Sequence, residues 1–234
     1  MSGYLVPDKP LMRWLGAPKF DRKNAQPVQK LEVELQGKRP VRITLVGHSF
    51  LTHILSQVEN EVGDEHNFGL RPSVAQMSYL VKGGKKLKHF DEHTIMAYNP
   101  DIVYFEIGSN DLSELEKTGN QMGRVLYDLA VKLISMGVKK VIAGEVIYRQ
   151  ADGVPNSKPE YNYEVQNMNW YLQSTMAESN NPRCFFWRHK NIWEASAIIY
   201  MDDGIHLNSL GNERMFRSIR GALLRFMREI KDEL

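Results

Sequence analysis

The sequence contains residues of the types that a serine nucleophile needs for acyl transfer. Ser49 follows a short apolar run and a glycine, and His206 lies near the end of the chain with Asp203 three residues before it. Hydrolysis by serine requires a base that accepts the hydroxyl proton and a carboxylate that orients this base. We therefore interpret Ser49 as a candidate nucleophile, His206 as its base and Asp203 as the residue that orients the imidazole.

The same chemistry needs hydrogen-bond donors for the negatively charged oxygen of the intermediate. The backbone N–H of Ser49, the N–H of Gly84 (or Gly83) and the side-chain amide of Asn110 are suitable donors. Removal of one such donor typically costs about 2.7 to 4 kcal/mol of transition-state stabilisation. Asn110, within the segment Gly108-Ser109-Asn110-Asp111, is therefore a candidate member of an oxyanion hole.

Each of these segments also has an ordinary structural explanation. A serine at the start of a helix commonly caps it, paired glycines and Asn-Asp are common in turns, and an aspartate before a histidine can be a cap. A catalytic site is indicated by the order of the segments together with their predicted positions in the fold.

The hydrophobic pattern predicts strands that alternate with helices. Apolar runs predict strands from 41 to the glycine at 47 and over 76–81, 101–107, 138–146 and 184–187. Apolar stripes at helical spacing predict helices after Ser49, over 87–98, 122–136 and 161–178, and in the last segment. In open α/β sheets ligands bind beyond the carboxyl ends of the strands, where Ser49, Gly83-Gly84 and Asn110 are predicted to lie.

The order of the four segments resembles the SGNH hydrolases, also called GDSL-like esterases, whose conserved blocks supply Ser, Gly, Asn and His. The blocks correspond to Gly47-His48-Ser49, Gly83-Gly84, Gly108-Ser109-Asn110-Asp111 and Asp203-Gly204-Ile205-His206, and the resemblance spans about residues 41 to 232. It implies an α/β fold of three α/β/α layers, flavodoxin-like, around a central, mostly parallel five-stranded sheet. It also implies hydrolysis of small esters, with acetyl or other short acyl groups, by Ser49, Asp203 and His206 without a cofactor or metal.

One residue departs from the family pattern, because His48 stands where these enzymes usually have an aspartate. A second interpretation is therefore a catalytically weakened domain that serves as a binding or assembly module. The retention of Ser49, Asn110, Asp203 and His206 argues against it. A nucleophile elbow of the α/β-hydrolase type is disfavoured because position 51 is Leu51 rather than glycine.

Composition limits the broad class of the protein. The 234 residues, 42% hydrophobic and 25% charged, suffice for one well-buried domain, which we place at 39–234, preceded by an N-terminal arm or linker at 1–38. As an arm it would pack partly on the domain through Leu11, Trp14 and Leu15; the alternative is a linker from an upstream segment. The net charge of +2 gives no global field that points to nucleic acid, so we do not expect nucleic acid as a partner for this domain alone. The resemblance to SGNH hydrolases implies a small-molecule ester as substrate. The oligomeric state stays open.

The remaining sequence signals are negative or weak. The seven histidines include no H-E-x-x-H pair, and the single Cys184 excludes an internal disulfide. No apolar stretch approaches the length of a membrane span and no signal peptide is visible, so we expect a cytoplasmic protein and interpret the final Lys-Asp-Glu-Leu as an ordinary helix end. Tyr148, Arg149 and Trp193 are further candidates for the wall of a pocket.

Overall fold

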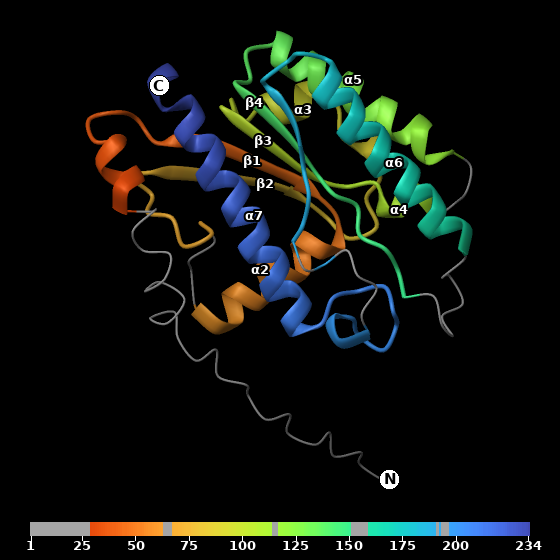
Figure 1. Ribbon diagram of the computed structural model, residues 1–234. Helices are drawn as coiled ribbons and strands as arrows, with labels where there is room; N and C mark the ends of the chain where they lie inside the picture. Colours follow the sequence, from red (N-terminus) through yellow and green to blue (C-terminus); the bar gives the residue numbers. More distant parts are fainter. Residues whose placement is uncertain (1–28, 63–66, 114–116, 151–158, 191, 193–196) are drawn as a thin grey trace.

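The sheet is parallel throughout and has five strands. The computed structural model describes residues 29–62, 67–113, 117–150, 159–190, 192 and 197–234. Within them the strand order is β2-β1-β3-β4-β5 (Figure 1), with the strands β1 Val41–Gly47, β2 Ala75–Val81, β3 Ile102–Glu106, β4 Lys140–Gly144 and β5 Cys184–Trp187. The predicted α/β class with a five-stranded sheet is confirmed, and this order is the flavodoxin-like one.

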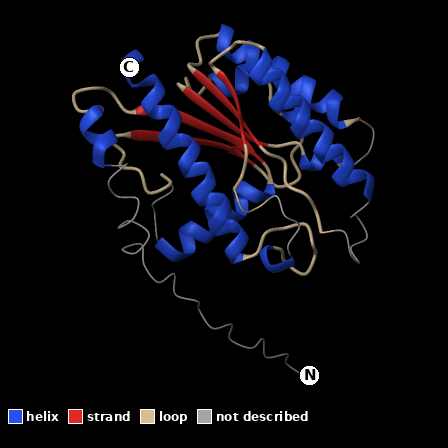
Figure 2. Ribbon diagram, viewed as in Figure 1, coloured by secondary structure: helices blue, strands red, loops and turns tan. Residues whose placement is uncertain are grey.

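Helices cover both faces of the sheet, which gives three layers (Figure 2). α2 (Ser49–Val62) and α7 (Ser209–Ile230) lie on one face, and α5 (Gly119–Ser135) and α6 (Pro159–Glu178) lie on the other (Figure 1). The shorter elements are α3 (Glu92–Met96), α4 (Ser109–Leu112) and the 3₁₀ turns η1 (Leu87–His89), η2 (Ala197–Ile199) and η3 (Lys231–Glu233). No helix in the described part of the chain is long and apolar enough to cross a membrane.

The predicted helix over 87–98 is divided into η1 and α3. Phe90 between them has an extended backbone, and Asp91 then caps α3 by accepting a hydrogen bond from the Thr94 N–H at 2.8 Å. The apolar spacing gave no sign of this interruption, because a local side-chain cap decides where the helix restarts.

Alternate side chains of the central strands enter two separate cores. In β3, Ile102 and Tyr104 belong to the core under α2 and α7, whereas Val103 and Phe105 belong to the core under α5 and α6. All four side chains are fully buried. This burial on both faces explains why the strand is a continuous apolar run in the sequence.

Residues 29–38, which the sequence analysis assigned to the arm, lie against the domain. A short helix over 29–34 places Leu31 in the core under α7, and Leu35 follows it there. The expected docking residues Leu11, Trp14 and Leu15 lie outside the described residues. The boundary between 38 and 39 stays a prediction.

Asp101 holds the start of β3 against the segment that leads into β1. Its buried carboxylate accepts two hydrogen bonds from the Arg39 guanidinium, at 2.6 and 2.7 Å, and one from the Arg42 N–H at 2.9 Å. Burial raises the pKa of Asp101, but the hydrogen bonds from Arg39 and Arg42 outweigh it and lower the pKa to about 2.

We expect Asp101→Asn to lower the free energy of unfolding at pH 7 by on the order of 2 kcal/mol. Because the folded pKa lies below the ordinary value, the ionised carboxylate stabilises the fold above about pH 4, and this contribution is lost as the pH falls through about 2. Urea titrations at pH 7 and about pH 3 measure the difference between wild type and variant. An equal difference at both pH values would contradict this account.

Candidate active site

Ser49 is the first residue of α2 and follows β1 by a single residue. Gly47, the last residue of β1, pairs in register with Glu106, the last residue of β3. The start of α2 therefore lies beside the end of β3. A Cβ atom at Gly47 would lie 2.6 Å from the Glu106 carbonyl oxygen, so only glycine permits this close approach. The unpaired N–H groups of the first helical turn favour negative charge beside Ser49.

Asp203 and His206 form a compact hydrogen-bonded turn before α7. The Asp203 carboxylate accepts hydrogen bonds from the backbone N–H groups of Ile205 and His206, each at 2.8 Å, and lies 2.6 Å from the His206 Nδ1 atom. Burial raises the pKa of Asp203, but the hydrogen bonds from His206 and Ile205 outweigh it and lower the pKa overall. The ionised carboxylate therefore favours a proton on Nδ1, which leaves the Nε2 atom of the neutral ring as an acceptor.

The His206 ring lies against the first turns of α2. Its centroid is 6.3 Å from that of Phe50, the residue after Ser49, and 4.8 Å from that of His53, one turn further along the helix. Ser49 and His206 form no hydrogen bond in the structure, although such catalytic bonds are often long without substrate. The fold thus places the His206 ring beside the first turns of the helix that begins with Ser49.

Asn110 lies in α4, directly beyond β3, and is tied to the glycine turn beyond β2. Its side-chain Nδ2 atom donates a hydrogen bond to the Lys85 carbonyl at 3.0 Å, which leaves the second amide hydrogen for another acceptor. Both carboxylate oxygens of Asp111 accept from the Leu87 N–H at 3.1 Å. Gly84 has φ +72°, a conformation that favours glycine.

His48, directly before Ser49 in the sequence, and Arg149 are both buried polar residues. His48 is 2% exposed, and its Nδ1 atom has no hydrogen-bond partner among the described residues. Burial, followed by the charges of Arg149 and His206, lowers the pKa of His48 to about 3. The position that usually holds an aspartate in the family therefore holds a neutral imidazole at physiological pH.

Arg149 is a buried cation beside the Asn110 segment. Its Nη2 atom donates to the Ser113 hydroxyl at 2.7 Å and to the Ser109 hydroxyl at 3.3 Å, and its guanidinium lies 4.1 Å from the centre of the Tyr161 ring. No carboxylate pairs with it in the described part of the chain. The sequence suggested Arg149 only as one of three residues for the wall of a pocket. Of the other two, Tyr148 accepts a hydrogen bond from the Tyr200 hydroxyl at its backbone carbonyl, and Trp193 lies outside the described residues.

His53 is the residue that sequence reasoning missed. The sequence analysis attached no role to it, yet its ring contacts that of the candidate base. Burial and the nearby His206 lower the pKa of His53, which keeps this neighbour neutral. Its position four residues after Ser49, one helical turn away, was the available signal.

The chain belongs to the GDSL-like lipase/acylhydrolase family, whose model matches residues 81–219, more than half of the sequence. The matched stretch contains the glycine turn, Asn110, Asp203 and His206, and it begins after Ser49. The resemblance inferred from the four segments is thus confirmed at the level of the family. A search among curated proteins found no match.

Solved structures share the fold at low sequence identity. An acetyl esterase crystallised with an acetate ion superposes with a TM-score of 0.59 at 14% identity, covering 81% of this chain and 99% of its own. A carbohydrate esterase family 3 protein from Talaromyces cellulolyticus gives 0.58 at 15% identity, with 81% and 99% covered. An acetylxylan esterase from Geobacillus stearothermophilus gives 0.54 at 13% identity, with 77% and 93% covered.

The buried neutral His48 predicts a loss of stability in acid. The folded state holds its pKa at about 3, against an ordinary 6.5, so the unfolded chain takes up a proton first as the pH falls. The stability present above pH 6.5 is therefore lost progressively towards pH 3, by about 2 kcal/mol at pH 5. His48→Gln cannot titrate and should lack this component; urea unfolding of both proteins at pH 7 and about pH 5 measures it. Equal losses in the two proteins would refute the assignment.

Proposed function

We propose that this protein is a serine esterase that hydrolyses small esters with acetyl or other short acyl groups through an acyl-serine intermediate. The carrying observation is the Asp203–His206 hydrogen bond at 2.6 Å together with the contact between the His206 ring and the first turns of α2. Membership of the acylhydrolase family supports the reaction class. The acetyl preference is supported by structural neighbours that are named as acetyl and acetylxylan esterases.

In the first half-reaction the Ser49 hydroxyl oxygen attacks the ester carbonyl carbon while His206 Nε2 takes its proton. Asp203 orients the ring and stabilises the imidazolium that forms. The tetrahedral intermediate collapses, the C–O bond to the alcohol breaks, and the proton on His206 passes to the leaving alcohol. In the second half-reaction His206 takes a proton from water while the water oxygen attacks the acyl carbon. The bond from this carbon to the Ser49 oxygen then breaks, the proton on His206 passes to Ser49, and the acid is released.

The oxyanion of each intermediate would be held by the backbone N–H of Ser49, the N–H of Gly84 or Gly83, and the amide of Asn110. The hydrogen bond from Asn110 to Lys85 supports this arrangement because it fixes the amide against the glycine turn. The buried Arg149 adds a positive charge next to the Ser109–Asn110 segment. Fixed charge near a developing oxyanion stabilises the transition state without reorganisation.

A binding or assembly module with little turnover is the second candidate, and His48 favours it. A neutral, buried imidazole cannot make the charged contacts of an aspartate immediately before the nucleophile. Under this alternative Ser49 would be a helix cap, and mutation of the triad would leave ester hydrolysis at its background rate.

Hydrolysis of p-nitrophenyl acetate should separate the two candidates. We expect Ser49→Ala and His206→Ala each to lower kcat by about 10⁴ to 10⁶, because the members of a triad act as a unit. Asn110→Ala should lower kcat by about 10² to 10³, the scale for one oxyanion donor. Arg124→Ala, on the exposed side of α5, is the control and should leave kcat unchanged. Equal rates for wild type and the Ser49 and His206 variants would rule out the esterase. The p-nitrophenyl acetate, butyrate and octanoate series then tests acyl length.

A further inference from the structure

The bond between His206 and Asp203 does not by itself fix the direction of the His206 ring. The Asp203 carboxylate holds the Nδ1 atom at 2.6 Å, but a single hydrogen bond leaves the ring free to tilt about this contact. The side chains of His206 and Asp203 are 30% and 43% exposed, so water borders part of the turn. Side chains that pack against the ring must therefore set the direction of the Nε2 atom.

Two aromatic residues of α2 provide this packing. Phe50 meets the His206 ring edge-on, with the centroids 6.3 Å apart and the planes at 64°. His53 lies closer, with the centroids 4.8 Å apart and the planes at 39°. Because Phe50 and His53 share the first turns of one helix with Ser49, a ring that packs on them is held in place relative to the start of this helix.

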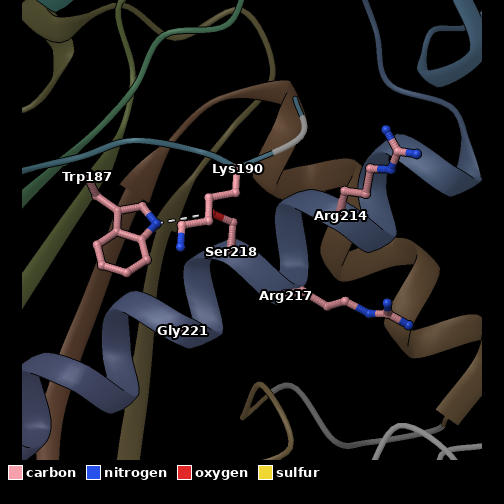
Figure 3. Close-up of a pocket in the computed structure, with 6 residues that line it drawn as sticks. All are labelled: Trp187, Lys190, Arg214, Arg217, Ser218 and Gly221. Carbon is pink, nitrogen blue, oxygen red and sulfur yellow. Dashed lines mark hydrogen bonds between the residues drawn. The ribbon is translucent and has the colours of Figure 1, made fainter. Parts of the chain in front are cut away.

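The surroundings of His53 differ from those of a histidine that links the sheet to α7. Both ring nitrogens of the fully buried His189 have partners, since Nδ1 lies 2.9 Å from the Ser218 hydroxyl and Nε2 lies 3.1 Å from the Glu106 carboxylate. The same hydroxyl accepts a hydrogen bond from Trp187 beside a hollow along α7 (Figure 3). In the described part of the chain His53 forms no hydrogen bond or ion pair, and its half-buried ring packs on the candidate base.

The charge of His53 matters because the proposed reaction creates a cation beside it. His206 becomes an imidazolium when it takes the Ser49 proton, and a neutral aromatic ring attracts a cation within about 6 Å of its centroid. A protonated His53 would instead repel this imidazolium. Burial and His206 lower the pKa of His53 from its ordinary 6.5, whereas Asp203, on the same turn as His206, raises it. The lowering prevails, so His53 is neutral near pH 7 and takes up a proton in acid.

We propose that His53 is a positioning residue of the esterase site: its ring, packed on the His206 imidazole, directs Nε2 towards Ser49, and a proton on His53 slows acyl transfer. This inference rests on the proposed function and adds to it the regulation of the site by pH. In this scheme His53 transfers no substrate proton and acts only through the base. The ring and the charge are separable, because phenylalanine keeps a flat aromatic ring and cannot take up a proton.

Hydrolysis of p-nitrophenyl acetate at about pH 8 tests the positioning. We expect His53→Ala to lower kcat by about 10- to 100-fold, the scale for a small misplacement of a reacting group, with KM changed by less than about threefold. His53→Phe should retain kcat within about threefold of wild type. His93→Ala, at an exposed position of α3, is the control and should leave kcat unchanged. Wild-type activity in His53→Ala, or equal losses in the alanine and phenylalanine variants, would overturn the proposal.

The pH profile of kcat/KM tests the charge. Between about pH 8 and pH 5 wild-type activity should fall more steeply than that of His53→Phe, because both His53 and His206 must be neutral in the wild type and only His206 in the variant. The ratio of kcat/KM in the variant to that in the wild type should therefore rise by at least about threefold towards pH 5. A ratio that stays constant would refute the effect of the His53 proton.

Ser49→Ala and His206→Ala, assayed in parallel, separate this proposal from the esterase itself. A loss of activity in these two variants without a loss in His53→Ala would refute the role of His53 alone. Wild-type rates in both would remove the esterase and this role with it. NMR titration of the His53 ring needs no activity and no His53 variant that folds. The pKa of His53 should rise in His206→Ala, and an unchanged pKa would refute the coupling of the two rings.

Discussion

The close approach of β1 and β3 at Gly47 is the constraint on which the candidate active site depends. Because Gly47 has no side chain, the Glu106 carbonyl oxygen can lie 2.6 Å from the place where a Cβ atom would be, and the two strands end side by side. β1 and β3 are also neighbours at the point where the strand order reverses, the usual place for a ligand in an open α/β sheet. Ser49 and Asn110, which follow these strands, are therefore brought to one edge although 60 residues of chain separate them.

The histidine reaches this edge from the other end of the sequence. The turn with Asp203 is fixed by its own hydrogen bonds and by Asn208, whose side chain caps α7 through the N–H groups of Leu210 and Gly211. α7 then packs along the sheet through an apolar face that includes Met215, Ile219 and Phe226. α7 thus anchors the turn that contains the candidate base, which lies directly before the amino end of this helix.

Most of the fold could be predicted from the sequence, because a strand that is buried on both faces of a parallel sheet is a continuous run of apolar residues. β5 was predicted with the observed bounds, 184–187, whereas the strand predicted over 138–146 is confined to Lys140–Gly144, since pairing with β3 and β5 ends there. The family and the positions of the four segments also followed from the sequence. The surroundings of Arg149 and His53 did not follow from the sequence, because the contacts of a lone arginine in a loop or of a histidine on a helix depend on residues that are distant in the chain. Likewise, Arg220 of α7 is buried and donates to the Phe68 carbonyl, a contact across 152 residues of sequence.

The proposed esterase activity depends on Ser49 being a nucleophile that His206 activates. The most direct test is treatment of the purified protein with a fluorophosphonate, followed by proteolysis and mass spectrometry of the peptides. We predict one covalent adduct on Ser49, with labelling that is slowed by at least about 10³ in His206→Ala. An unlabelled Ser49 in the wild-type protein, or labelling at the same rate without His206, would contradict the account.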